Sequence, residues 1–131
     1  MAIEYRTGPT ALPPGAFLGL AQLVWPRDYD VARVSAAITR TSNASAWDGA
    51  RLVGAVRVLT DGHLFSTVPE ILVDPAYRRR GIGRRLMAMA LELAPGGKLF
   101  LGAQSGNEAF FEACGFTRGP VGYVGRLVSS P

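Results

Sequence analysis

Two Asp-Gly pairs limit most strongly what this chain of 131 residues can fold into. Asp48-Gly49 and Asp61-Gly62 each lie between apolar or β-prone runs, which is the strongest short-range signal for a β-hairpin. Two successive hairpins predict a three-strand antiparallel meander. Its strands are expected at about Thr41–Trp47, Ala50–Leu59 and Leu64–Val73.

The remaining elements are expected to surround this meander. The mostly apolar run Ala16–Trp25 predicts a helix packed on the core, and helical spacing returns after Val73 until Pro95. Further elements are expected as a strand at Lys98–Ala103, a short helix at Asn107–Cys114 and a final strand at Tyr123–Val128. This order predicts an α/β (α+β) fold with a mixed, mostly antiparallel sheet flanked by helices. With 48% hydrophobic residues, the chain is expected to form a single domain over 1–131.

The positive charge of the chain is concentrated in one short stretch. Five arginines lie within eight residues: Arg78, Arg79, Arg80, Arg84 and Arg85. Removing these five from the net charge of +4 leaves −1 for the rest of the chain. Such a local charge suits one anionic group or a few phosphates better than a nucleic-acid backbone, so no nucleic-acid partner is expected. A small nucleic-acid-binding domain that uses the arginine cluster is the alternative function that we rank last.

Cysteine usage and hydropathy indicate a cytoplasmic protein. Cys114 is the only cysteine, which excludes an intrachain disulfide and suits a reducing compartment. The run Ala16–Trp25 is too short to span a bilayer and no signal-peptidase motif follows it, so no membrane partner is expected. His63 has no companions at metal-ligand spacing, and no metal site is predicted.

The segment with the clearest chemical content lies between the third strand and the following helix. Gly81 and Gly83 leave the amides of a first helical turn uncovered, so that an anion can approach the positive end of the helix dipole. The dinucleotide fingerprint is excluded because Leu86 occupies its third glycine position. A Walker loop is excluded because the only lysine is Lys98. The segment therefore predicts a pyrophosphate cradle of another kind.

Three motifs carry a resemblance to the GNAT superfamily of N-acetyltransferases. Arg78-x-x-Gly81-x-Gly83 is similar to its signature of Arg or Gln, two residues, Gly, one residue, then Gly or Ala. Val73-Asp74-Pro75-x-Tyr77 and the stretch Phe110–Phe116 also resemble the family. The resemblance extends from about Trp47 to Phe116. It implies a GNAT-like fold with a splayed, bulged central strand, in which an interruption by Pro69 is tolerated.

The resemblance implies acetyl-CoA as the acetyl-donor substrate and a small-molecule or peptide amine as the acceptor. It is also compatible with a homodimer. Asn107 is expected either to bind the pantetheine or to cap its helix. The cofactor-binding residues are expected to be Ile71, Leu72, Val73, Arg78, Arg79, Arg80, Gly81, Ile82, Gly83, Arg84, Asn107 and Phe111.

The implied reaction is direct attack of a neutral amine on the thioester in a ternary complex. An ammonium with a pKa of ~10.4 is mostly protonated at neutral pH, and its deprotonation costs about 4 kcal/mol. Glu70 is the candidate catalytic carboxylate. The alternative interpretation is that Glu70 is an exposed charge on the strand face without a catalytic role. In the family a tyrosine usually protonates the departing CoA thiolate, but this chain has Phe111 at that position. Solvent or Tyr123 would therefore protonate the thiolate. An idle acetyl-CoA-binding sensor or interaction module is therefore the main alternative function.

Overall fold

A computed structural model of the chain describes residues 2–127, which divide after Leu101 into two compact units. The first unit contains a five-stranded sheet and three α-helices, and the second contains one short α-helix. The elements of the first unit are β1 (Glu4–Thr7), α1 (Pro14–Val24), α2 (Val31–Ile38), β2 (Ser42–Asp48), β3 (Arg51–Thr60), β4 (Ser66–Thr67), β5 (Ile71–Val73), the 3-10 turn Pro75–Tyr77, α3 (Ile82–Leu93) and the 3-10 turn Pro95–Gly97.

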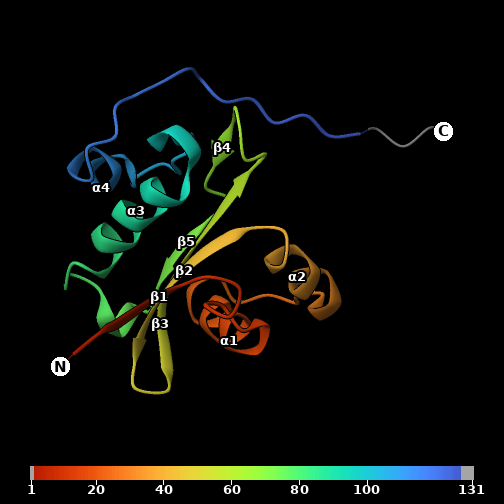
Figure 1. Ribbon diagram of the computed structural model, residues 1–131, viewed down its shortest axis with the longest axis vertical. Helices are drawn as coiled ribbons and strands as arrows, with labels where there is room; N and C mark the ends of the chain where they lie inside the picture. The colour runs from red at the N-terminus through yellow and green to blue at the C-terminus, as the bar shows by residue number, and fades with distance from the viewer. Residues whose placement is uncertain (1, 128–131) are drawn as a thin grey trace. The chain divides into compact units, whose positions relative to one another are not determined.

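The sheet is built around β3, the longest strand, as Figure 1 shows. The strands run in the order β1-β2-β3-β4, and β5 also pairs with β3, so that β4 and β5 follow each other along one edge. All of these pairs are antiparallel. The first predicted hairpin joins β2 and β3 at Asp48-Gly49, and the second joins β3 to β4 at Asp61-Gly62. The predicted meander and the α/β fold class are confirmed.

The third strand of the meander is split in two rather than continuous from Leu64 to Val73. At the end of β4 the Val68 N–H donates to the Phe100 carbonyl at 3.0 Å, and the Phe100 N–H donates to the Ser66 carbonyl at 3.0 Å. The chain thus turns its hydrogen bonds away from β3 just before Pro69, which has no N–H to give. It returns to β3 only at β5, and the strand is splayed as expected.

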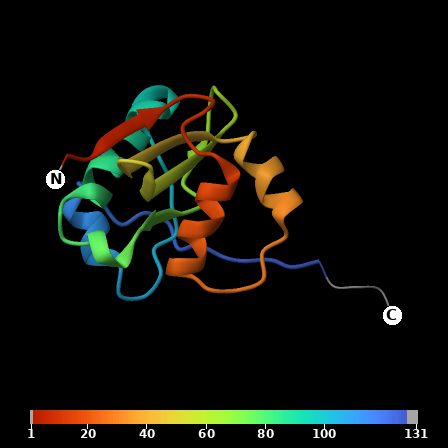
Figure 2. The same ribbon diagram turned by 90° about the horizontal axis from the view of Figure 1, so that it is seen from below.

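Helices cover the two faces of the sheet unequally (Figures 1 and 2). On one face lie α1 and α2, and the core there includes Phe17 of α1 and Leu72 of β5. On the other face α3 packs directly against β3 at Gly54, where an added Cβ would lie 2.9 Å from Cδ1 of Leu86 and 3.0 Å from Cγ2 of Ile82. A glycine at this position therefore lets α3 approach the sheet closely.

Two predicted strands do not form. Of Lys98–Ala103, only Phe100 makes a bridge, in the parallel sense, to Thr67. Residues 123–127 of the predicted strand Tyr123–Val128 have no strand structure, and Val128 lies outside the described residues. Both sequences are β-prone, but a strand also requires a continuous partner, which neither has in the described part of the chain.

The predicted helix near Asn107 is confirmed as α4 (Glu108–Ala113) in the second unit. One or two helices were expected before the meander, and the structure has two, α1 and α2; β1 was not predicted. In residues 2–127 no helix combines the length and apolar character that a membrane span requires. Nor do three or more His, Cys, Asp or Glu side chains gather there as ligands for a metal ion.

Candidate active site

Asp74 fixes the chain where it leaves β5 towards the arginine-rich loop. Its side chain is buried, and its N–H donates to the Val53 carbonyl at 2.8 Å. One carboxylate oxygen accepts from the Ala76 N–H at 2.9 Å, and the other accepts from the Arg51 guanidinium at 2.6 Å. The hydrogen bond to Asp74 raises the pKa of Arg51. This carboxylate therefore starts the 3-10 turn Pro75–Tyr77 and ties it to the sheet.

Tyr77 anchors the same loop to the turn between β2 and β3. Its hydroxyl donates to Oδ2 of Asp48 at 2.5 Å, and this hydrogen bond raises the pKa of Tyr77 above its usual 10.0. The guanidinium groups of Arg51 and Arg80 lie over its ring at 5.2 and 5.1 Å from the centroid. Tyr77 thus packs the loop and positions the residues that follow it.

Gly81 shapes the N-terminus of α3. It adopts the left-handed conformation, with a φ of 79°, and no atom lies within 4 Å of where its Cβ would be. No side chain caps the helix, so the first-turn amides of Ile82 and Gly83 have no side-chain acceptor. These amides form the positive end of the helix dipole. This open, uncapped terminus has the geometry of an anion cradle.

Arginines surround this cradle. Arg78, Arg79 and Arg84 are exposed, and none of them makes an ion pair with another residue in the range 2–127. Arg79 has a φ of 63°, which makes it the only described residue other than glycine in the left-handed region. A conformation of this kind costs energy and is concentrated at functional sites. The loop thus presents cationic side chains around an uncapped helix terminus.

The backbone of β5 has one paired and one open edge. Glu70 accepts from the Arg57 N–H at 3.3 Å and Asp74 donates to the Val53 carbonyl, so alternate residues from 70 to 74 face β3. The backbone groups of Ile71 and Val73 therefore face the other edge, where no strand of the described residues pairs. An extended ligand has free main-chain donors and acceptors there.

A cavity of about 190 Å³ opens on the α1 and α2 face of the sheet. Aromatic side chains from α1 and the segment after it form much of its wall: Phe17, Trp25 and Tyr29. Leu72 of β5, which is 1% exposed, lies on the sheet side, together with Glu70. By strand alternation both side chains point to this face. The predicted strand residues are thus divided: the Leu72 side chain lines the cavity, whereas Ile71 and Val73 offer their backbone to the open edge.

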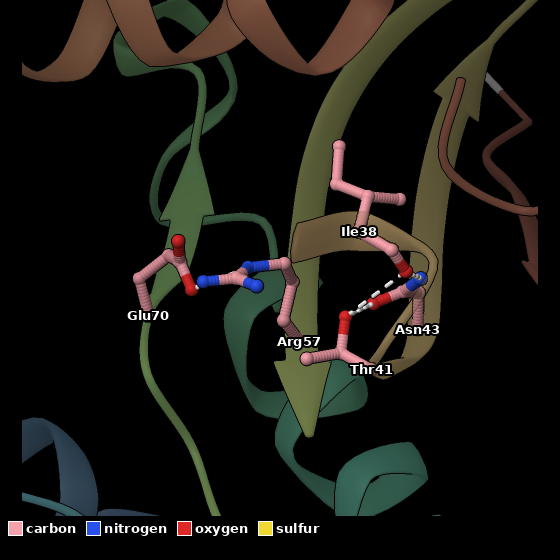
Figure 3. Close-up of polar contacts among 5 residues, drawn as sticks. All are labelled: Ile38, Thr41, Asn43, Arg57 and Glu70. Carbon is pink, nitrogen blue, oxygen red and sulfur yellow. Dashed lines mark hydrogen bonds and ion pairs between the residues drawn. The ribbon is translucent and has the colours of Figure 1, made fainter. Parts of the chain in front are cut away.

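Glu70 is held by a short ion pair (Figure 3). Its Oε2 accepts from Nε of Arg57 at 2.8 Å, and the two side chains are 17% and 14% exposed, respectively. On the neighbouring strand β2, Asn43 pairs in register with Arg57 and donates from its amide to the Ile38 carbonyl at 3.1 Å. The Thr41 hydroxyl donates to the Asn43 side-chain oxygen at 2.7 Å. This network fixes the end of α2 beside the charged pair.

The other predicted site residues lie in the second unit. Asn107 precedes α4 but makes no side-chain cap hydrogen bond. Phe111 packs edge-on against Phe110 and Phe116, with ring centroids 5.0 and 6.3 Å apart. Tyr123 is 92% exposed. The structure therefore brings Glu70, β5 and the cradle together in one unit, and places Asn107, Phe111 and Tyr123 in the other.

Two residues that line the cavity with Glu70, one charged and one aromatic, were not predicted from the sequence. Arg57 meets Glu70 only through the register of β3 with β5, and Tyr29 reaches the cavity from the segment between two helices. No local motif signals either residue. Trp25 lines the cavity, whereas Trp47 is buried in the core.

Comparison with known proteins decides the family. The family model described as "Acetyltransferase (GNAT) domain" matches residues 42–118, which is more than half of the chain. This chain belongs to the GNAT family. The match begins at β2 and contains β5, the cradle and α4.

Individual GNAT relatives agree with this assignment. The N-alpha-acetyltransferase RimI of Mycobacterium tuberculosis is 44% identical over 54 residues, which cover 39% of this chain and 34% of that protein. A GNAT-family acetyltransferase of Streptococcus pneumoniae has the same fold, with a TM-score of 0.80 at 24% identity over 96% of this chain and 100% of its own. The chain spans well under half the length of the curated relatives it matches.

Another structure of similar fold contains a ligand. AAC(6')-Iy, in complex with a bisubstrate analogue of CoA, has a TM-score of 0.75 at 17% identity, and the match covers 97% of this chain and 100% of that chain. At this identity the likeness concerns the fold alone.

Proposed function

We propose that this GNAT protein transfers an acetyl group from acetyl-CoA to a primary amine in a ternary complex. The observation that carries the proposal is the position of β5 between two sites. Its open backbone edge leads through Asp74 to the cradle at α3, and Glu70 immediately before it lines the cavity. A donor on the open edge and an amine in the cavity would thus meet at one short strand.

The residues of the cradle fit the anionic part of acetyl-CoA. Its diphosphate would accept from the first-turn amides of α3, which the left-handed Gly81 leaves uncovered. Arg78, Arg79 and Arg84 would neutralise further phosphate charge by charge-assisted hydrogen bonds. The pantetheine would lie along the backbone of Ile71 and Val73. Bound in this way, acetyl-CoA supplies the activated thioester.

Glu70 would prepare the acceptor. Because Arg57 holds one carboxylate oxygen, the other is oriented to bind the incoming ammonium and to take its proton, directly or through a water. The free amine then forms the new N–C bond while the C–S bond breaks and the thiolate leaves, and the acylated nitrogen releases its extra proton to solvent to give the neutral amide. A main-chain N–H on the open edge of β5 would stabilise charge on the thioester oxygen. Solvent or Tyr123 would protonate the thiolate, because residue 111 is phenylalanine.

The two compact units are proposed to act as one GNAT domain over 1–131, because the family match at 42–118 continues across the boundary after Leu101. Asn107 and Phe111 are kept as proposed cofactor-binding residues. A cytoplasmic location belongs to the same proposal, since a single cysteine suits a reducing compartment.

The test monitors free thiol while the protein is incubated with acetyl-CoA and a panel of amines. We expect amine-dependent thiol release in which Glu70→Gln lowers kcat/KM by about 100-fold, within the usual range for general acid–base groups. Glu92→Gln, at an exposed position of α3, is the matched control and should keep full activity. An unchanged acetyl-CoA thermal shift shows that each variant is folded.

The same experiment separates the alternative function. Tight acetyl-CoA binding without turnover of any amine would contradict acetyl transfer and favour the idle sensor or interaction module. Activity that persists in Glu70→Gln would instead leave acetyl transfer standing and remove Glu70 from the catalytic role.

A further inference from the structure

The cavity beside Glu70 is lined by an ion pair on one side and by a single arginine on the other. Glu70 lies on the sheet side, where Arg57 already holds one of its oxygens. On the helix side the only charged lining residue is Arg27, in the segment between α1 and α2. Aromatic and aliphatic side chains, among them Trp25, separate the two. An occupant that complements this cavity is apolar in the middle, carries an anionic group towards Arg27 and directs a hydrogen-bond donor such as an ammonium to the other oxygen of Glu70.

Arg27 is fixed in place by its neighbours. The Gln22 side chain donates from Nε2 to the Arg27 carbonyl at 2.6 Å and accepts from the Arg27 N–H at 3.1 Å. The Arg27 guanidinium lies over the ring of Tyr29, 5.0 Å from its centroid. The Tyr29 hydroxyl in turn donates to the Trp25 carbonyl at 2.7 Å. This side of the cavity is therefore preorganised, which reduces the entropic cost of binding a ligand.

The charge of Arg27 is left without an acidic partner. It makes no ion pair with any residue in the described range 2–127. Asp28 follows it in the chain but does not line the cavity, and the Asp30 carboxylate accepts from the Arg33 N–H to cap α2. An anionic group of a ligand is the complement that the planar guanidinium of Arg27 recognises best.

We propose that the acceptor is a small zwitterionic amine, an amino-acid-like molecule with an apolar or aromatic body. Its amino group would meet Glu70 beside β5, and its carboxylate would bind Arg27. The cavity volume of about 190 Å³ equals the liquid volume of about six waters, which suits a molecule with one ring. Two arginines against one carboxylate would disfavour polycationic amines. This inference rests on the proposed acetyl transfer and names its substrate class.

The test compares three acceptors that differ only in their carboxylate and adds one polycationic amine. Acetyl transfer to phenylalanine, phenylalaninamide, 2-phenylethylamine and spermidine is measured as kcat/KM at equal concentrations of free amine. One charge-assisted contact at a partly exposed site predicts about a tenfold preference for phenylalanine over 2-phenylethylamine. The amide should resemble 2-phenylethylamine, and spermidine should be the poorest acceptor.

Variants then assign the preference to Arg27. In Arg27→Gln the ratio of phenylalanine to 2-phenylethylamine should fall towards one, chiefly through a higher KM for phenylalanine, and Arg27→Lys should restore part of it. Arg33→Gln is the matched control, because Arg33 is exposed on α2 and does not line the cavity. This control should keep the wild-type ratio.

Equal or better use of 2-phenylethylamine by the wild type would overturn the inference, as would a preference that survives in Arg27→Gln. Calorimetric titration of the same ligands into the CoA-saturated protein measures the carboxylate preference without turnover. If no amine is acetylated but phenylalanine still binds through Arg27, the proposed function fails and the ligand class stands. If amines are acetylated without a carboxylate preference, only the ligand class fails.

Discussion

The two faces of the sheet use arginine in opposite ways. On the α3 face, Arg78, Arg79 and Arg84 are exposed around an uncapped helix terminus and have no ion-pair partner in residues 2–127. On the α1 and α2 face, Arg57 is largely buried and paired with Glu70, and Arg27 is stacked on an aromatic ring.

The difference shows two strategies for binding. The α3 face offers exposed charge and main-chain amides, which suit a large, highly charged ligand whose phosphates are recognised one by one. The other face offers a preorganised cavity of fixed size, in which one charge is already neutralised inside the protein. The first arrangement favours affinity for a common donor, and the second favours discrimination among acceptors.

The largest effect is expected from Gly81→Asp on the α3 face. Aspartate tolerates the left-handed conformation and caps helices well, so the variant should fold. Its carboxylate would occupy the cradle and repel phosphate, and we expect acetyl-CoA affinity to fall by about 100-fold or more. Thermal shift with acetyl-CoA measures the loss.

The matched control for this variant is Gly62→Asp. Gly62 lies in the turn between β3 and β4, has a φ of 83° and also has open space around its Cβ position. It should keep the full thermal shift. If Gly81→Asp is stabilised by acetyl-CoA as strongly as the wild type, the phosphates bind elsewhere and the contrast between the two faces is wrong.

A smaller effect is expected from a pair of glycines that belong to opposite faces. Gly54→Ala would place its Cβ 2.9 Å from Cδ1 of Leu86, and this overpacking under α3 should lower the free energy of unfolding by about 1–3 kcal/mol. Gly19→Ala lies at an exposed position of α1 with open space and should raise it by about 0.5–1 kcal/mol. Urea unfolding measures both, and a Gly54→Ala variant that is as stable as the wild type would contradict the close packing of α3.

The smallest effect concerns Tyr77, which anchors the loop of the α3 face. Its pKa is raised by the hydrogen bond to Asp48, so the unfolded chain loses the proton first, near pH 10. The stabilisation by this hydrogen bond should therefore be complete below pH 10 and disappear as pH rises through the higher pKa of the folded protein. Absorbance titration of the wild type minus Tyr77→Phe isolates this tyrosine. Asp48→Asn should return its titration towards pH 10, and no change in this variant would exclude Asp48 as the cause.

The sequence predicted more of the α3 face than of the α1 and α2 face. The cradle is encoded by contiguous residues, because one turn and one helix start need glycines and arginines at fixed spacing. The meander was also predictable, since Asp-Gly turns act locally. The splitting of its third strand was signalled by Pro69, but the partner that draws the chain away, Phe100, is remote in sequence.

The cavity was not predictable by such means. Arg57 and Glu70 are brought together by the register of β3 with β5, and Arg27 is placed by packing between α1 and α2. The predicted strand Lys98–Ala103 failed for a related reason, since only Phe100 finds a pairing position. Interactions that depend on distant partners leave no spacing pattern to read.

The hydrogen bonds between the Gln22 side chain and the Arg27 backbone have a consequence for how the choice of acceptor can change. The segment between α1 and α2 is held by bonds from residues within or next to it: Gln22 binds Arg27, Tyr29 binds the Trp25 carbonyl, and Asp30 caps the next helix. None of these bonds involves the sheet. The backbone of the segment is therefore held by local bonds, so we expect that substitutions of its cavity-lining side chains change the acceptor while the donor site stays unchanged.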